Sequence, residues 1–343
     1  MKASIERVEL PLETPFTISR GTKRTVENLI VVIKHNGSTG YGAAAPARYY
    51  GETADTVAAL LPELLDAVES IGDPHARNQV HERMATVAGD NPAAKAAVDT
   101  ALWDLAGKLL GEPVYRLLGL SASASCPPTS YTVGLDDPET MAERAKAAVD
   151  AGYPVLKLKL GSERDRDIVR SVREIAPEAT IRVDANEAWT PSAAVRNCKA
   201  LADYGVEFVE QPVAAGNAEG LRRVYEQSPL PIAADESCVV AGDIPAVADS
   251  CDIVNLKLMK TGGLTPAVEA IYTARAHGLD VMCGCMVETN ASIAAAAQLL
   301  PLLSYADLDG SLLLDSDPYE GVSVSDGRFD LGAVDCGTGV APR

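Results

Sequence analysis

Lysine is scarce in this 343-residue chain, which contains 11 Lys beside 19 Arg. Acidic residues outnumber basic ones by 48 to 30, so the formal net charge is −18. A surface of this sign repels nucleic acids and anionic membranes, and we therefore expect neither as a partner. Because lysine is rare, each lysine in a patterned position calls for a chemical explanation.

Pairs of cysteine and histidine with metal-ligand spacing are also missing. The seven cysteines are scattered, and Cys283 and Cys285 have no second Cys or His pair that would complete a zinc site. The four histidines stand in no nucleophile signature, which argues against a serine or cysteine triad. The most apolar stretch, residues 291–306, is interrupted by polar residues, and the chain opens with no basic and apolar leader. We therefore expect a reduced, cytoplasmic protein without a membrane span.

The periodicity of the first part of the chain changes from alternating to helical. Residues 5–10 and 26–33 alternate or run apolar around turn signals, which predicts a small antiparallel meander. Over residues 53–110 the apolar period is that of helices. Residues 1–118 are therefore expected to form an α+β domain, to which the tail at about residues 315–343 returns.

Short apolar runs alternate with helical segments over residues 119–314. The runs end at positions separated by 22 to 28 residues: Thr132, Lys159, Asp184, Glu210, Asp235, Lys257, Cys285 and Asp307. Strands at this period with helices between them indicate an α/β barrel rather than an open sheet. Polar residues at the C-terminal ends of barrel strands line the catalytic mouth, so the strand-end residues are the candidate site.

Two of these strands carry patterned lysines. Lys157 and Lys159 alternate with leucines, so both ammonium groups face one side of their strand. Two neighbouring cations in a partly dry site are expected to lower each other's pKa, as a lysine base near neutral pH requires. Lys257 and Lys260 belong to a later strand motif, and Lys257 is expected across the barrel from Lys159. The alternative is an edge strand with solvated lysines.

Three consecutive strands end in a carboxylate: Asp184, Glu210 and Asp235. Carboxylates that converge from adjacent strands repel one another unless a cation lies between them. An all-oxygen set of this kind favours a hard divalent ion, here Mg²⁺. Asn186 and Glu236 stand beside the expected ligands and are candidates for orienting them. The alternative for each aspartate is a helix N-cap.

Asp307 and Asp309 close the eighth strand, and their spacing places both carboxylates on one face. In a solvated turn such a pair has no function. Next to the other strand ends, the pair predicts a recognition site for a cationic group such as an amine.

These residues together resemble the enolase superfamily, in its muconate-lactonizing-enzyme-like branch, and within it the dipeptide epimerases of the L-Ala-D/L-Glu epimerase type. The similarity covers nearly the whole chain and includes Pro15-Phe16, Arg20-Gly21, Ala101-Leu102-Trp103-Asp104-Leu105, Lys157-Leu158-Lys159, Asp184-Ala185-Asn186-Glu187, Glu210-Gln211-Pro212, Asp235-Glu236-Ser237, Lys257-Leu258-Met259-Lys260-Thr261-Gly262-Gly263 and Asp307-Leu308-Asp309-Gly310. The resemblance implies a modified TIM barrel, (β/α)7β, covered by an N-terminal α+β capping domain.

The resemblance also implies the reaction, a Mg²⁺-dependent inversion of the α-carbon of a dipeptide's C-terminal residue by two-base 1,1-proton transfer. It assigns Mg²⁺ to the three carboxylates. The bound Mg²⁺ would in turn hold the terminal carboxylate of the substrate. The remaining implied roles are acid/base for Lys159 and Lys257, electrostatic help for Lys157, ammonium binding for Asp307 and Asp309, and substrate lining for Thr132 and Met286.

Specificity in this family depends partly on the loop after the first strand, here residues 16–24. This loop carries Arg20, Lys23 and Arg24, which suit an acidic side chain on the second residue of the dipeptide, as in L-Ala-L-Glu. The alternative is a mobile loop with solvated charges. Ala43 stands where many relatives have Glu, and this difference bears on cap closure and specificity rather than on the reaction class.

Other functions remain open at this point. A different reaction of the same branch would keep the metal and the lysines: cycloisomerisation, o-succinylbenzoate synthesis or N-acylamino acid racemisation. A dipeptide with a non-acidic second residue is a further alternative. A non-catalytic barrel and a Schiff-base aldolase that uses Lys159 are weaker alternatives, because neither needs the three carboxylates. The sequence leaves open whether the chain forms a homo-oligomer.

Overall fold

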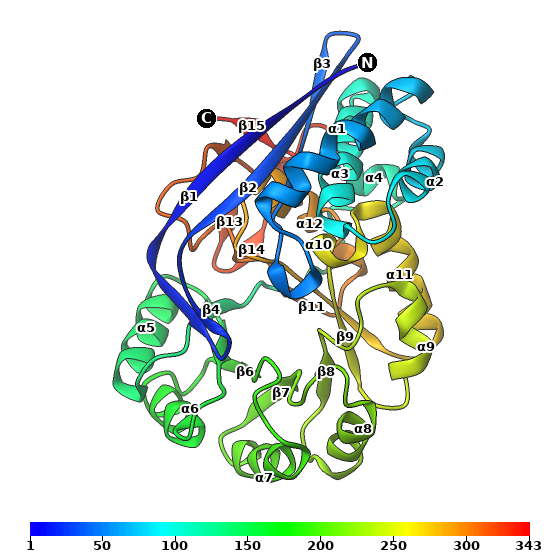
Figure 1. Cartoon of the computed structure of the whole chain (residues 1–343). Helices are drawn as coiled ribbons and strands as arrows, with labels where there is room; N and C mark the ends of the chain where they lie inside the picture. Colours follow the sequence, from blue (N-terminus) through cyan, green and yellow to red (C-terminus); the bar gives the residue numbers. More distant parts are fainter.

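The computed structural model describes all residues from Met1 to Arg343. A long antiparallel sheet and a group of helices lie against one end of a barrel of parallel strands (Figure 1). None of the helices combines the length and the apolar character that crossing a membrane requires.

The N-terminal part is a three-stranded sheet with helices packed on it. The strands are β1 (Lys2–Ile18), β2 (Gly21–His35) and β3 (Ser38–Ala44), and the helices are α1 (Ala54–Ile71), α2 (Arg77–Val87), α3 (Pro92–Leu110) and α4 (Val114–Leu117). Helix α3 packs directly on β3, because a Cβ at Gly40 or Gly42 would overlap backbone carbonyl oxygens of α3. The predicted meander is confirmed, and its strands extend beyond the predicted ranges.

The residues from 131 to 307 form the barrel. Its strands pair in chain order and in parallel: β4 (Tyr131–Val133), β5 (Val155–Lys159), β6 (Thr180–Asp184), β7 (Val206–Glu210), β8 (Ile232–Ala234), β9 (Ile253–Lys257), β10 (Asp280–Gly284) and β11 (Tyr305–Asp307). The intervening helices are α5 (Pro138–Asp150), α6 (Asp165–Ile175), α7 (Pro191–Ala202), α8 (Ala218–Gln227), α9 (Ile244–Val247), α10 (Leu258–Thr261), α11 (Leu264–Ala276) and α12 (Asn290–Ala297). The predicted (β/α)7β fold is confirmed, and each predicted strand end lies in a strand or directly after one.

The barrel is closed where β11 meets the segment before β4. The carbonyl oxygen of Ala306 accepts a hydrogen bond from the Ser130 backbone N–H at 3.1 Å and one from the Arg182 guanidinium at 3.0 Å. Arg182 reaches this oxygen through the barrel interior, where its guanidinium lies 5.3 Å from the Phe208 ring centre and 5.1 Å from that of Tyr305. The side chain thus joins β6 to β11 at the end of the barrel away from the mouth.

The segment predicted as a loop at residues 16–24 is instead the tip of the β1–β2 hairpin. Phe16 pairs with Lys23 and Ile18 pairs with Gly21, so only two residues form the turn. The strands continue because this segment contains the β-branched and aromatic residues that favour extended backbone. Figure 1 shows the hairpin (dark blue) extending down to the barrel beside β4.

The C-terminal tail contacts the N-terminal part. The backbone N–H and the hydroxyl of Thr338 both donate to Asp104 on α3, at 2.8 and 3.0 Å, and Leu314 pairs with Leu12 on β1. The tail also contains the short strands β12 (Tyr319–Glu320), β13 (Val324–Ser325), β14 (Arg328–Phe329) and β15 (Ala341–Pro342). The domain boundaries at residues 118 and 314 stay a prediction.

Candidate active site

The three strand-end carboxylates meet at the mouth of the barrel. Asp184, Glu210 and Asp235 lie on or directly after β6, β7 and β8, and none of them is exposed to solvent. One oxygen of each lies within 4.8 Å of the oxygens of the other two. The N-cap alternative is wrong for both aspartates, because α7, the helix after Asp184, has Thr190 as its N-cap, and α9, the helix after Asp235, has Asp243.

The electrostatics of this cluster suit a bound cation. Burial and the charge of Asp184 raise the pKa of Glu210 to about 7. One oxygen of Glu210 is buried without a hydrogen-bond donor, although the Lys157 ammonium lies 2.8 Å away as an ion pair. Oxygen ligands alone, with several negative charges, are the donor set that Mg²⁺ prefers. The residues present therefore fit this ion.

Lys159 and Lys257 flank the carboxylates from opposite sides of the barrel. The Lys159 ammonium donates to Asp184 at 2.6 Å, and the Lys257 ammonium donates to Asp235 at 2.7 Å. Their strands, β5 and β9, are four positions apart in the order of the eight-stranded sheet. Both residues are 8% exposed, so the edge-strand alternative is wrong.

Lys157 is more deeply buried than the other two lysines. It is 1% exposed, and its ammonium lies 2.6 Å from Asp307, 2.8 Å from Glu210 and 3.4 Å from Asp184. Burial disfavours its charge, but these three carboxylates together raise the pKa of Lys157 well above its usual value. Asp235 raises the pKa of Lys257 in the same way, against the effect of burial.

The prediction that neighbouring lysines lower each other's pKa is therefore wrong for Lys157. The charges that surround it are mainly negative, and their attraction exceeds both burial and the repulsion between the lysines.

The two aspartates after β11 have different partners. Asp307 uses both oxygens, one for the Lys157 ammonium at 2.6 Å and the other for the Ser130 hydroxyl at 2.5 Å. The Asp309 carboxylate has Thr132 as its only hydrogen-bonding neighbour, with the Thr132 backbone N–H at 2.5 Å. Burial and the charge of Asp307 raise the pKa of Asp309 to about 6. Asp309 thus keeps an oxygen for a further donor, whereas Asp307 does not.

The other predicted lining residue, Met286, lies in the loop after β10. Its backbone oxygen packs against Gly310, where a Cβ would overlap it, so this loop lies next to Asp309. Glu288 shapes the loop by accepting hydrogen bonds from the Met286 backbone N–H at 2.7 Å and from the Ser292 hydroxyl at 2.5 Å. Burial raises the pKa of Glu288 to about 7. The sequence analysis did not identify this residue.

Two further residues hold the carboxylates in place: Lys260, which the sequence placed in the β9 motif without a role, and Asn255, which sequence reasoning missed. Lys260 is fully buried and donates to Asp235 Oδ1 at 2.6 Å and to three backbone carbonyl oxygens. Asn255 donates to Glu210 at 2.7 Å, and a Cβ at Gly284 would collide with the Asn255 side chain. Asn255 stands two residues before Lys257, so strand alternation places both on one face, a signal that could have identified it.

The residues expected to orient the carboxylates contact different groups. Asn186 donates to Asp184 from its backbone N–H at 2.8 Å and from its side-chain amide at 3.2 Å. Glu236 accepts a hydrogen bond from Arg20 at 2.7 Å and has no such bond to a lysine of the site. The structure therefore connects Glu236 to the N-terminal hairpin.

The three cations of the hairpin tip, Arg20, Lys23 and Arg24, differ in whether they form ion pairs. Arg20 pairs with Glu187 and Glu236, whereas neither Lys23 nor Arg24 forms an ion pair. Ala43 is fully buried in β3 and pairs with Ile30 of β2.

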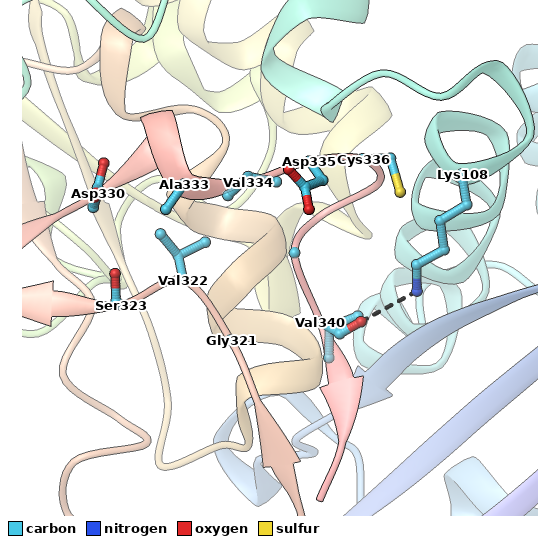
Figure 2. A pocket seen from close by; sticks show the side chains of 11 residues that line it. Lys108, Gly321, Val322, Ser323, Asp330, Ala333, Val334, Asp335, Cys336 and Val340 are labelled. Carbon is cyan, nitrogen blue, oxygen red and sulfur yellow. Dashed lines mark hydrogen bonds between the residues drawn. The ribbon is translucent and has the colours of Figure 1, made fainter.

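A separate pocket of about 370 Å³ lies between α3 and the C-terminal tail (Figure 2). Lys108 is its one basic side chain, and its ammonium already donates to Asp104 and to the carbonyl oxygens of Thr39 and Val340. No strand-end residue lines this pocket. The site chemistry therefore lies at the barrel mouth and not in this pocket.

Comparisons with known proteins agree with this geometry. Residues 1–119 match the mandelate racemase / muconate lactonizing enzyme N-terminal domain family, and residues 140–343 match the enolase C-terminal domain-like family. The L-Ala-D/L-Glu epimerase of Bacteroides thetaiotaomicron is 37% identical over 333 residues, which cover 96% of this chain and 85% of that protein. The hydrophobic dipeptide epimerase of Roseobacter litoralis is 40% identical over 336 residues, which cover 95% of each.

A solved structure extends the similarity to three dimensions. The crystal structure of the dipeptide epimerase from Enterococcus faecalis V583, complexed with Mg and the dipeptide L-Leu-L-Tyr, aligns with a TM-score of 0.91 and 35% identity and covers 99% of both chains. The chain therefore belongs to the enolase superfamily, in the muconate-lactonizing-enzyme-like branch and among its dipeptide epimerases.

Proposed function

We propose that this protein inverts the α-carbon of the C-terminal residue of a dipeptide in a Mg²⁺-dependent reaction, with L-Ala-D/L-Glu as its substrate. The observation that supports this most directly is the position of two lysines on opposite sides of three buried carboxylates. A group placed between these lysines is open to proton transfer from either side.

In this proposal Lys159 and Lys257 are the two catalytic residues. One neutral amine removes the α-proton from its face of the substrate, and the opposite ammonium delivers a proton to the other face. For the reverse direction the two residues exchange roles. Lys157, charged and buried beside Glu210, attracts the substrate's terminal carboxylate and offsets the negative charge that develops there.

Asp184, Glu210 and Asp235 would hold the metal. When bound, Mg²⁺ acts as a Lewis acid on the substrate carboxylate and makes the α-proton more acidic. Asn255 and Lys260 keep two of these carboxylates in place through the hydrogen bonds described above.

The mouth also offers groups for the two ends of a dipeptide. Asp309 has a carboxylate oxygen free for the ammonium group of the first residue, which favours free dipeptides over N-acylated or amine-free substrates. Lys23 is a cation without a carboxylate partner near the mouth, which favours an acidic side chain on the second residue. We further propose a cytoplasmic location, and we leave the oligomeric state open.

The test is incubation with Mg²⁺ in D₂O and a panel of dipeptides, read by mass spectrometry and by chiral separation. L-Ala-L-Glu should gain one deuterium and yield L-Ala-D-Glu. Faster conversion of a dipeptide with an apolar second residue would show that the enzyme prefers hydrophobic dipeptides to L-Ala-L-Glu. Turnover of an N-acylated amino acid without any dipeptide turnover would contradict the proposal.

A further inference from the structure

The tip of the β1–β2 hairpin docks on the barrel through loops that follow several strands. The Leu135 backbone N–H donates to the Thr17 carbonyl oxygen at 2.8 Å, and the Ser19 hydroxyl donates to the Asn186 carbonyl oxygen at 3.0 Å. Gly161 makes room for this contact, because a Cβ there would lie 3.0 Å from the Cβ of Ser19. The tip is thus seated on the barrel and not free in solvent.

One carboxylate accepts three hydrogen bonds at this seat. Glu187 Oε2 accepts a hydrogen bond from Arg20 at 3.1 Å, and Oε1 accepts from the Tyr49 hydroxyl at 2.9 Å and the Ala215 backbone N–H at 2.7 Å. These donors come from the hairpin tip, from the turn before α1 and from the loop after β7. Glu187 therefore joins two separate segments of the N-terminal part to the barrel.

The backbone at Glu187 is unusual for a residue with a side chain. Its φ is +69°, and φ of the preceding Asn186 is +43°. A residue other than glycine rarely adopts this region unless its surroundings hold it there. The loop after β6 thus presents the Glu187 carboxylate in a fixed direction.

The charge of Arg20 is already paired within the chain in this arrangement. Its guanidinium contacts Glu187 at 3.1 Å and Glu236 at 2.7 Å, and lies 4.7 Å from the Tyr49 ring centre. Two carboxylates already offset its single charge. Arg20 therefore connects the hairpin to the loop that follows β8.

Lys23 differs from Arg20 in its lack of an ion pair and in its position on the hairpin. Lys23 is the cross-strand partner of Phe16, so the two side chains share a face of the hairpin. Phe16 packs on the apolar cluster that includes Val287 of the loop after β10, so this face is directed at the barrel mouth. Neighbouring atoms and the charge of Arg20 lower the pKa of Lys23, yet the residue stays exposed at the hairpin tip, where a substrate can reach it. Arg24, the next residue, points to the opposite face.

We propose that Glu187 is a positioning residue that fastens the hairpin tip over the active site, and that this fastening occupies Arg20 and leaves Lys23 as the cation that recognises the substrate's acidic side chain. The specificity part rests on the proposed dipeptide epimerase function. The fastening part does not, because it concerns contacts within the chain.

Limited proteolysis tests the fastening without any substrate. Trypsin cleaves after Arg20, Lys23 and Arg24, whose side chains are exposed but whose backbone is held in the paired hairpin seated on the barrel. Loss of the charged hydrogen bonds in Glu187→Ala should speed cleavage at the tip by about tenfold or more. Glu163→Ala removes an exposed carboxylate from the neighbouring loop after β5 and is the matched control, with cleavage as in the wild type. Equal rates in Glu187→Ala and the wild type would overturn the fastening.

Glu187→Gln guards against a variant that fails to fold, because it retains the side-chain oxygen and removes only the charge. Its cleavage rate should lie between those of the wild type and Glu187→Ala, with thermal unfolding as the check of folding. Tyr49→Phe removes a single donor and should speed cleavage by a smaller factor.

Kinetics with L-Ala-L-Glu and L-Ala-L-Leu test the specificity part. Lys23→Met should raise KM about tenfold for L-Ala-L-Glu alone, whereas Arg20→Met should raise KM for both dipeptides by similar factors. Lys34→Met, at the far end of β2, is the control and should change neither. A selective loss in Arg20→Met, or equal losses in Lys23→Met, would overturn the assignment. A wild type inactive on every dipeptide would instead contradict the proposed function, and trypsin would still decide on the fastening.

Discussion

Replacing Asp309 by Asn is expected to weaken the use of dipeptides and to spare analogues that lack the ammonium group. The Asp309 carboxylate has only Thr132 as a hydrogen-bonding neighbour, so one of its oxygens is available to a substrate. The Asn variant keeps the size of the side chain and loses its charge. Any selective effect therefore reports the interaction between this carboxylate and the substrate's cation.

The magnitude follows from the type of contact. A hydrogen bond to a charged group contributes about 1.5–3 kcal/mol, which corresponds to a loss of about 10- to 150-fold in kcat/KM. The site around Asp309 is 3% exposed, so solvent screening is weak and the upper part of this range applies. For propionyl-L-Glu, the amine-free analogue of L-Ala-L-Glu, the expected change is less than about threefold.

The assay is proton–deuterium exchange at the α-carbon, followed for both substrates with the wild type, Asp309→Asn and Asp307→Asn. Asp307 holds Lys157, so its replacement should impair both substrates to a similar extent. Equal losses on both substrates in Asp309→Asn would refute the assignment of Asp309 to the ammonium group. A loss confined to the dipeptide in Asp307→Asn would show that the two aspartates have exchanged roles.

The pH dependence provides an independent check. Burial and the charge of Asp307 raise the pKa of Asp309 to about 6, so Asp309 is ionised above this pH and neutral below it. The ratio of kcat/KM for the dipeptide to that for its amine-free analogue should therefore fall about tenfold per pH unit on the acid side. The ratio cancels ionisations that affect both substrates, and Asp309→Asn should make it independent of pH.

Three further predictions concern the lysines and the barrel. Lys159→Ala and Lys257→Ala should each abolish epimerisation and retain α-proton exchange on only one enantiomer, as NMR in D₂O measures; exchange on both enantiomers would contradict a one-sided base. Lys260→Met leaves Asp235 and three carbonyl oxygens without their buried donor and should lower the free energy of unfolding by about 3–5 kcal/mol, measured with urea. Arg182→Leu should cost about 2 kcal/mol in the same assay, because the Ala306 oxygen loses a charged donor at the barrel seam.

The barrel and its strand ends could be predicted because the signals are local and repeated. Apolar runs at a steady spacing determine the strands, and a carboxylate or a lysine at the end of six of the eight runs indicates which side chains reach the mouth. The confirmed strands β5 to β9 end at or directly before residues read from the sequence. This part of the fold needs no knowledge of distant contacts.

The predictions that were wrong, and the contacts that were not predicted, depend on residues distant in the chain. The pKa of Lys157 rises because Asp307, 150 residues away in the chain, lies against it. Lys260 reaches back to Asp235 only because α10 turns the chain immediately after β9. The loop at residues 16–24 was expected from the family resemblance, and the pairing of this segment within the hairpin was not identified from its residues.

The hairpin has a consequence for how the enzyme's selectivity can change. Its tip belongs to a ribbon that leaves the N-terminal sheet and meets the barrel mainly through side chains and loop backbone, while the lysines and carboxylates stand on other strands. A short peptide exchange at positions 19–24 could therefore retarget the catalyst while the reacting groups keep their places. In an engineered library, or in natural divergence, this ribbon is an exchangeable specificity-determining segment, provided that each new tip retains an arginine for Glu187.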